Sequence, residues 1–485
     1  MISADIVKRA IAGHSWLGLL SGALMYLVCL SGSLLVFSSE IEQWEQPDAP
    51  TVSPSDLNLV AAETTFNEVL GNGAVLTPHM YLVTPTSDSP RARIASEKES
   101  WFLHPNGELG PKERVFWSSM LRDLHYFLHL PKSWGMVLVS SLGAILVGLI
   151  ITGLFAHPSI LRDAFALRLN KSLQLKETDI HNRLSVWAAP FHLTIAVTGA
   201  FFGLALPTLA IIAEAEFAGD QQAVIETVYG TDPQVELSQG PIAVNAILQQ
   251  MPVLANNGET FLLTVHEAES ATRFVGVSVQ HKDSMIYSEN YLFTTAGAFI
   301  RTDGWKDGSV GKKVLYSIYR LHFGNFSGYW VKVAYFILGM SLTVVAASGV
   351  NVWLAKRRVE DGLSDLWAGV VWGSPLALML SASMSFYFDS GLAAIFWLVL
   401  GGSSMLALYL RDLFRFKSLA RRLNALGLVV LLVIQVVLFG ENALRSAAMI
   451  INQIVFALLV ALVLAEAVQI RLSRRLAPTG YGARQ

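Results

Sequence analysis

Long apolar runs alternate with polar stretches along the whole chain. A helix needs roughly 20 apolar residues to cross a hydrocarbon core of about 30 Å. Eight runs reach or approach that length, at about 14–37, 136–156, 186–211, 329–354, 365–387, 392–410, 424–440 and 447–470. The pattern predicts a polytopic all-α membrane protein with about eight transmembrane helices. No small-residue cleavage site directly follows the first run, so we expect an uncleaved anchor rather than a signal peptide.

Two polar stretches, 38–124 and 212–321, are too long and too polar to lie in lipid. Each combines one amphipathic helix, at 56–70 and at 242–251, with segments in which apolar and polar residues alternate. These segments predict strands at 80–84, 91–96, 101–104, 261–265, 273–280, 284–289 and 291–294. We therefore expect two small α+β domains, inserted between the first and second and between the third and fourth transmembrane helices.

Basic residues orient the path across the membrane. They precede the first apolar run and follow the second, fourth, sixth and eighth: Lys8, Arg9, Arg162, Arg168, Lys171, Lys176, Arg183, Lys356, Arg357, Arg358, Arg411, Arg415, Lys417, Arg421, Arg422, Arg471, Arg474 and Arg475. An eight-crossing path places all of them on one side, and Lys and Arg are enriched in cytoplasmic loops. We expect a bacterial inner-membrane protein with both termini in the cytoplasm and both polar stretches in the periplasm.

These features divide the chain into eight parts. Transmembrane helices one to four are expected at 1–37, 125–157, 186–211 and 322–356. The periplasmic domains cover 38–124 and 212–321, and a cytoplasmic loop covers 158–185. Residues 357–485 form a C-terminal block of four transmembrane helices that contains no histidine.

The composition agrees with a membrane protein and limits the chemistry. Hydrophobic residues make up 53% of the chain and charged residues 15%, against about a quarter charged in soluble proteins. The net charge of −2 and the lack of a basic patch argue against a nucleic-acid partner, so the surroundings we expect are membrane lipids. A single cysteine, Cys29, cannot form a disulfide, a cysteine-based zinc site or an iron–sulfur cluster within one chain. Redox chemistry would need a cofactor held by other residues.

The first 355 residues contain an internal duplication built around histidine and glycine. The unit is a helix, a periplasmic domain and a second helix, and it occurs twice. In each copy the first helix has a histidine eighteen residues before a glycine, and the second helix has a histidine 27 or 28 residues before a glycine. The pairs are His14 with Gly32, His181 with Gly199, His125 with Gly153, and His322 with Gly349.

The four duplicated histidines are candidate ligands of a haem iron. His14 and His181 begin helices that rise from the cytoplasm, and His125 and His322 begin helices that descend from the periplasm. Two-fold repetition places each pair at one depth, and a low-spin b-type haem takes two axial imidazoles from opposite sides. A single interfacial histidine is often only tolerated at the headgroup level. Four at duplicated positions favour a functional site.

Two further histidines leave alternatives open. His129 lies four residues after His125, on the same helical face, so either of the two could be the ligand. His192 lies eleven residues after His181 and nearly on the same face. It fits a second haem level, a proton relay or a buried polar contact.

Several segments resemble the PepSY-associated transmembrane family over residues 5–358. They are IAGHSWLG at 11–18, LRDLH at 121–125, IHNRL at 180–184, LHFG at 321–324 and GVNVWL at 349–354. The resemblance implies PepSY-like periplasmic domains, two b-type haems and axial ligation by His14, His125, His181 and His322. It also implies kinship with iron-regulated inner-membrane reductases of ferric siderophores. Ser185 stands where the family often has Gly, and the last four apolar runs go beyond the four-helix reductases.

The expected function is transmembrane electron transfer that reduces a periplasmic ferric siderophore and releases iron, which makes the chain an oxidoreductase. Hard oxygen ligands hold Fe(III) better than Fe(II), so reduction loosens the complex. No GxGxxG unit is present, and the loop at 157–185 is too short for a flavin or nicotinamide domain. A cytoplasmic reductase or a membrane quinol must then supply electrons. The alternatives are a siderophore or iron permease component without redox activity, and a PepSY-type binding or inhibitory module. No catalytic residue is assigned.

Overall fold

A computed structural model describes the chain at residues 3–157, 165, 172–282, 284–304, 308, 310–357, 359 and 361–476. In this part of the chain, eight helices are long and apolar enough to cross a membrane. They are α1 (Ala4–Leu35), α5 (Lys132–Ala156), α8 (Ala189–Glu216), α12 (Tyr329–Arg357), α13 (Gly362–Met384), α14 (Leu392–Leu410), α15 (Leu413–Phe439) and α16 (Ser446–Leu476). The chain is a multi-pass helical membrane protein, as its apolar runs predicted. Of the basic residues named above, Arg162, Arg168, Lys171 and Arg358 lie outside the described residues.

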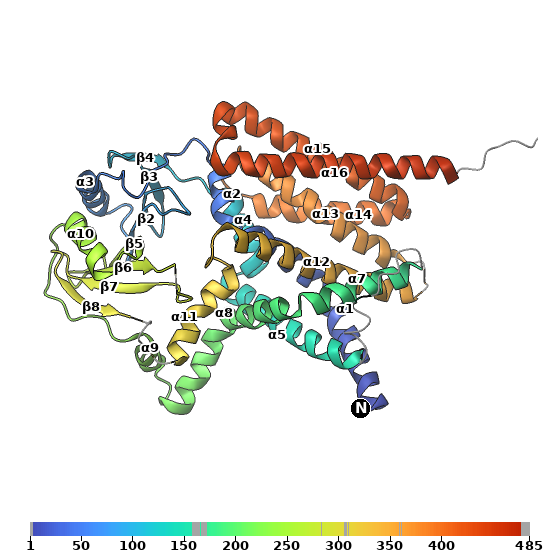
Figure 1. The fold of residues 1–485 in the computed structure, drawn as a ribbon, viewed down its shortest axis with the longest axis horizontal. Helices are drawn as coiled ribbons and strands as arrows, with labels where there is room; N and C mark the ends of the chain where they lie inside the picture. The colour runs from blue at the N-terminus through green and yellow to red at the C-terminus, as the bar shows by residue number, and fades with distance from the viewer. Residues whose placement is uncertain are drawn as a thin grey trace, which may run out of the picture.

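The two polar stretches form one sheet, which lies with its helices at one end of the long helices (Figure 1). Its strand order is β4-β3-β2-β1-β5-β6-β7-β8, and every neighbouring pair is antiparallel. The strands are β1 (Met80–Val83), β2 (Arg93–Ser96), β3 (Ser100–Leu103), β4 (Leu109–Lys112), β5 (Glu259–His266), β6 (Phe274–Gln280), β7 (Glu289–Phe293) and β8 (Phe299–Asp303). β1 and β5 join the halves, with Leu82 opposite Leu263. We call β1–β8 with α3 (Leu59–Leu70) and α10 (Val244–Leu254) the sheet domain.

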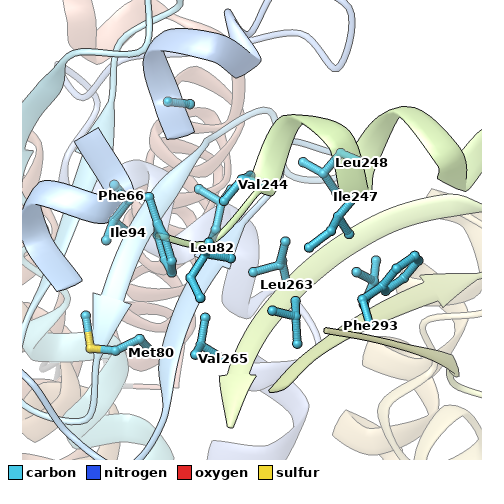
Figure 2. Packing of buried hydrophobic residues seen from close by; sticks show 14 of the residues in the cluster. Phe66, Met80, Leu82, Ile94, Val244, Ile247, Leu248, Leu263, Val265 and Phe293 are labelled. Atoms are coloured by element: carbon cyan, nitrogen blue, oxygen red, sulfur yellow. The ribbon is translucent and has the colours of Figure 1, made fainter. Parts of the chain in front are cut away.

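One face of the sheet is buried by α3 and α10 in a core that both halves share (Figure 2). Successive side chains of a strand point to opposite faces, and in β1 the buried Met80 and Leu82 alternate with half-buried residues. Leu82 of β1 and Leu263 of β5 are fully buried, and Phe66 of α3 and Ile247 of α10 pack into the same cluster. The sequence predicted a helix and strands in each stretch but not their union in one sheet.

The predicted strands differ from the structure in two respects. Residues 284–288 form an irregular segment with bends at 285–287 instead of a strand, and β7 begins at Glu289. The strands β4 and β8 were not predicted, and both lie at the edges of the sheet. β4 contains Gly110 and Pro111, residues that weaken a strand signal and that edge strands tolerate.

Short helices connect the membrane helices to the sheet domain: α2 (Ser38–Glu45), α4 (Phe116–Phe127), α9 (Gln221–Tyr229) and α11 (Val310–Phe323). His125 and His322 lie near the ends of α4 and α11, so the prediction that they begin the descending helices is wrong. The helix breaks after each histidine, because Leu128 has a φ of 53° and Gly324 has a φ of 68°. The membrane helices α5 and α12 start only at Lys132 and Tyr329.

His181 also lies on a helix of its own, α7 (Leu173–Trp187), which occupies part of the expected cytoplasmic loop. The helix α8 starts after a break at Ala188, and Pro190 lies in its first turn. Proline has no amide N–H and its ring clashes with the carbonyl four residues earlier, which ends α7 at this point. The third predicted membrane segment, 186–211, corresponds to α8, whereas His181 lies near the end of α7, so the prediction that His181 begins the ascending membrane helix is wrong.

The helices α13–α16, which we call the C-terminal block, pack against the helices of the first copy of the unit. Trp367, Phe396 and Leu400 of the block share an apolar cluster with Tyr26 of α1 and Leu124 of α4. The hydroxyl of Tyr26 donates a hydrogen bond to the carbonyl oxygen of Val371 at 3.0 Å. The block and the first half of the chain thus form a continuous interior.

Candidate functional site

Each of the four duplicated histidines faces a glycine on a neighbouring membrane helix. A Cβ atom at Gly32 would lie 2.4 Å from Cε1 of His125, which is closer than real Cβ contacts. The equivalent distances to Cε1 are 3.3 Å for Gly153 and His14, 3.1 Å for Gly199 and His322, and 3.2 Å for Gly349 and His181. The glycines that mark the internal duplication are therefore the positions where the imidazole rings approach the backbone.

Hydrogen bonds fix the orientation of these rings through Nδ1. Three of the Nδ1 atoms lie near a carbonyl oxygen four residues before the facing glycine. The distances are 3.0 Å from His14 to Leu149, 3.0 Å from His181 to Val345 and 2.9 Å from His125 to Val28. A carbonyl oxygen only accepts, so Nδ1 carries the proton and Nε2 keeps its lone pair.

The fourth ring, His322, uses a hydroxyl in place of a carbonyl. Its Nδ1 lies 2.9 Å from Oγ1 of Thr198, and that hydroxyl donates its own proton to the carbonyl oxygen of Thr194 at 2.6 Å. Nδ1 of His322 is therefore the donor as well. Among the residues that the structure describes, no hydrogen bond reaches Nε2 of any of the four rings. Neutral imidazoles with an open Nε2 are common metal ligands.

A hydroxyl residue precedes all four glycines, which the sequence analysis missed. These residues are Ser31, Thr152, Thr198 and Ser348. Thr152 and Ser348 lie 3.3 Å from Nδ1 of His14 and His181, and Ser31 lies 3.5 Å from Nδ1 of His125. The signal was present in the sequence as a Ser-Gly or Thr-Gly pair at each repeated glycine.

His14 and His181 lie side by side at the ends of the helices far from the sheet domain, which we call the far level. Their ring centroids are 6.1 Å apart and the ring planes are inclined by 84°. The rings come from different helices, α1 and α7, and each is anchored to a further helix, α5 or α12. Four helices thus converge on this pair.

His125 and His322 line one apolar cavity near the sheet domain, which we call the sheet-side level. The cavity has a volume of about 350 Å³, and Gly32 and Gly199 also line it. Most of the lining is apolar, and the hydroxyl-bearing rings Tyr126 and Tyr319 belong to it. A largely apolar cavity of this size with a few convergent polar groups is typical of a cofactor site.

The two levels lie far apart along the membrane helices. His14 at the far level and Gly32 at the sheet-side level are both on α1, eighteen residues apart. At a rise of 1.5 Å per residue this is about 27 Å. Met25, Leu146 and Leu342 belong to one apolar cluster and also line the sheet-side cavity.

The structure separates His129 from the cavity. Its Nδ1 accepts a hydrogen bond from the indole N–H of Trp397 at 3.0 Å, and its Nε2 lies 2.9 Å from the carbonyl oxygen of Met120. Both ring nitrogens are therefore engaged, and the residue does not line the cavity. Of the two alternatives, this geometry favours His125 over His129.

His192 is a buried polar contact between two helices. It is 2% exposed, and its Nε2 lies 3.1 Å from the hydroxyl of Ser341 on α12. The sequence left three interpretations of His192 open: a second haem level, a proton relay or a buried polar contact. This geometry favours the buried polar contact. The sheet domain holds His79, His104, His266 and His281, and no group of three His, Cys, Asp or Glu residues among the described positions could hold a metal ion.

Comparison with known proteins agrees with the repeated histidine motifs. A family model described as "PepSY-associated TM region" matches residues 12–356. An uncharacterized protein of Pseudomonas aeruginosa is 22% identical over 255 residues, which is 49% of this chain and 63% of that protein. The match thus spans less than two thirds of that relative. The family match begins just before His14 and ends just before the C-terminal block, and the chain belongs to the PepSY-associated transmembrane family.

Proposed function

We propose that the chain binds two b-type haems, at the far level through His14 and His181 and at the sheet-side level through His125 and His322. On this basis it moves electrons across the inner membrane to a ferric siderophore. The observation that carries the proposal is the ring separation of 6.1 Å between His14 and His181. Each Nε2 there is open, because Nδ1 makes the hydrogen bond.

The far level meets the distance requirement of two axial ligands on one metal ion. A metal–imidazole bond of about 2 Å on each side, plus about 1 Å from nitrogen to ring centre, places the centroids about 6 Å apart. The observed 6.1 Å agrees with this value. A pair of histidines that only shared a polar contact would direct a ring nitrogen at the other ring or at a common acceptor.

The chain's own residues prepare the imidazoles and the space around them. The carbonyl oxygens of Leu149 and Val345 hold the Nδ1 protons, which fixes the tautomer and raises the basicity of Nε2. Gly32 and Gly199 let the rings of His125 and His322 lie against the helix backbone, and the apolar lining excludes water. A bound b-type haem supplies a one-electron iron couple whose potential follows its axial ligands and its burial.

The basic residues support an orientation with the sheet domain in the periplasm. Lys8 and Arg9 lie in the first turns of α1, and Arg357 ends α12. Arg411 caps the end of α14, and Arg415 lies in the first turn of α15. Chain connectivity places all these helix ends opposite the sheet domain. Lys and Arg favour the cytoplasmic side. The sheet-side level then adjoins the periplasm, where a ferric complex with oxygen ligands is the substrate and Fe(II) leaves more readily. A cytoplasmic reductase or a membrane quinol is the electron donor.

Haem content and a redox titration test the proposal. Protein purified in detergent from haem-replete cells should contain two haems per chain and show a b-type spectrum on reduction with dithionite. A ferric hydroxamate complex added without oxygen should reoxidise it and yield Fe(II). A haem-free preparation would reject the proposal and leave a permease component or a PepSY-type binding module. A haem-loaded preparation that the ferric complex does not reoxidise would reject the substrate.

A further inference from the structure

The C-terminal block lies outside the residues that match the family, yet it contacts both ends of α4, the helix that carries His125. At the start of α4, the indole N–H of Trp117 donates to the hydroxyl of Ser381 on α13 at 3.2 Å. At the end of α4, the indole N–H of Trp397 on α14 donates to His129 at 3.0 Å. These contacts join residues more than 260 positions apart in the sequence.

The chain adopts a costly backbone conformation directly after α4. Leu128 and His129 have φ values of 53° and 57°, in the left-handed region that side chains other than Gly seldom occupy. Such residues persist only where surrounding contacts hold them. The Cβ position of Gly135 in α5 lies 2.5 Å from the carbonyl oxygen of Phe127, so the turn is also tight.

His129 holds this turn with a fixed tautomer. Because the Trp397 indole N–H can only donate, Nδ1 of His129 accepts and its Nε2 carries the proton. Nε2 then donates to the carbonyl oxygen of Met120 within α4. The ring of His129 therefore ties the turn back onto α4 and outward to α14.

Apolar side chains also pack α4 and the following turn against α14. Leu121, Leu124 and Leu128 are buried in one cluster with Phe396 and Leu400 of α14. The ring of His129 also contacts Phe396, with centroids 6.0 Å apart. His125 lies between Leu124 and Leu128, so any shift of α4 against α14 moves its ring relative to Gly32.

We propose that the C-terminal block is a brace for α4, and that Trp397 and His129 are positioning residues that hold the imidazole of His125 against Gly32. The role of His125 as a haem ligand rests on the proposed function, whereas the brace itself rests on the contacts of α4. The block carries no histidine of its own, and it acts on the sheet-side level through the turn at 128–131.

Trp397→Phe tests the brace, because it keeps an aromatic ring and removes the N–H donor. We expect amide hydrogen exchange at the end of α4 to become about fivefold faster, which is the effect of losing one neutral hydrogen bond. The midpoint potential and the electron paramagnetic resonance signal of one haem should shift, and those of the other haem should remain. Trp330→Phe is the matched control, because Trp330 is 80% exposed on α12 and should change neither measurement.

His129→Gly is the second variant, because Gly accepts the positive φ and removes both hydrogen bonds. It should accelerate exchange at least as much as Trp397→Phe does, and the double variant should add little to His129→Gly alone. Unchanged exchange in both variants would reject the brace. Faster exchange with both haem signals unchanged would reject the link to His125 while the brace stands. A parent protein without haem would reject the proposed function, and the exchange measurement would still decide the brace.

Discussion

The two copies of the duplicated unit place a histidine at the same level but support it from different sides. α4, with His125, is braced by the C-terminal block through Trp117 and Trp397. α11, with His322, is fastened to the sheet domain, because Arg320 donates to the carbonyl oxygens of His281 and Ser284 after β6. The difference teaches that the contact between histidine and glycine was duplicated, whereas the support of the histidine-bearing helix was not.

The hydrogen-bond partners of the two imidazole rings also differ between the copies. Nδ1 of His125 bonds a backbone carbonyl, that of Val28, and Nδ1 of His322 bonds the hydroxyl of Thr198. The approach to glycine is also tighter for His125, with 2.4 Å against 3.1 Å between Cε1 and the Cβ position. The α4 side is therefore the more closely packed of the two, and substitutions at equivalent positions should have unequal effects.

The largest expected effect is the loss of a haem when one axial histidine is removed. On the proposed function, His125→Ala and His322→Ala should each reduce haem content from two per chain to one, because the proposal assigns both rings to the sheet-side haem. His14→Ala and His181→Ala should each remove the other haem. Pyridine haemochrome assays per polypeptide measure the stoichiometry, and optical redox titrations identify which haem remains.

The control is His104→Ala, an exposed histidine of the sheet domain that should leave both haems in place. If His125→Ala retained two haems while His129→Ala lost one, the assignment between these neighbours would be reversed. If each of the four substitutions removed both haems, the two levels would not be independent sites.

The second prediction tests whether the two halves of the sheet, β1–β4 and β5–β8, unfold together. Leu82→Ala removes a fully buried side chain of β1, beside the junction with β5, and should cost about 2–5 kcal/mol. Because one core serves both halves, hydrogen exchange should rise in β5 and β6 as well as in β1 and β2. Val60→Ala on the exposed side of α3 is the control, since Val60 is 63% exposed. A change confined to β1–β4 would show two independent domains.

The third prediction compares alanine substitutions at Gly32 and Gly199. Gly32→Ala places a methyl group against the His125 ring and should destabilise the sheet-side level by about 1–3 kcal/mol through overpacking. Gly199→Ala should destabilise the protein less, because the distance from its Cβ position to Cε1 of His322 is longer than the distance from Gly32 to His125. Haem content and thermal stability of the two variants provide the measurement. Equal losses, or a greater loss for Gly199→Ala, would contradict the order.

The sequence predicted the membrane helices and the pairing of repeats because these depend on local composition and spacing. It did not predict the union of β1 with β5, since alternation along Met80–Val83 specifies a buried face and not a partner strand. It placed His125 at the start of a long helix although Pro131, directly before α5, is a local signal of a helix break. The left-handed turn at Leu128 has no such local signal. That break at Leu128 depends on Trp397, which lies 268 residues beyond His129 and belongs to another element.

The smallest expected effect is a pH response confined to the α4 side. Glu45 of α2 accepts hydrogen bonds from the backbone N–H groups of Trp117 and Ser118 and so caps the start of α4. Burial raises the pKa of its carboxyl group to about 7, above the ordinary value of 4.5. The folded protein therefore keeps a proton that the unfolded chain has released between these pH values.

The sign follows from that difference in bound protons. The stability that Glu45 contributes is fully present below pH 4.5 and is lost as the pH rises through about 7. Hydrogen exchange in α4, corrected for its intrinsic pH dependence, should accelerate over this window, and α11 serves as the internal reference. Glu45→Gln keeps an acceptor oxygen without a titrating group, so its α4 should show a flatter profile. An equal pH response of hydrogen exchange in α4 and α11, unchanged by Glu45→Gln, would contradict this prediction. The difference between the two copies would then lie only in the contacts of Trp117 and Trp397.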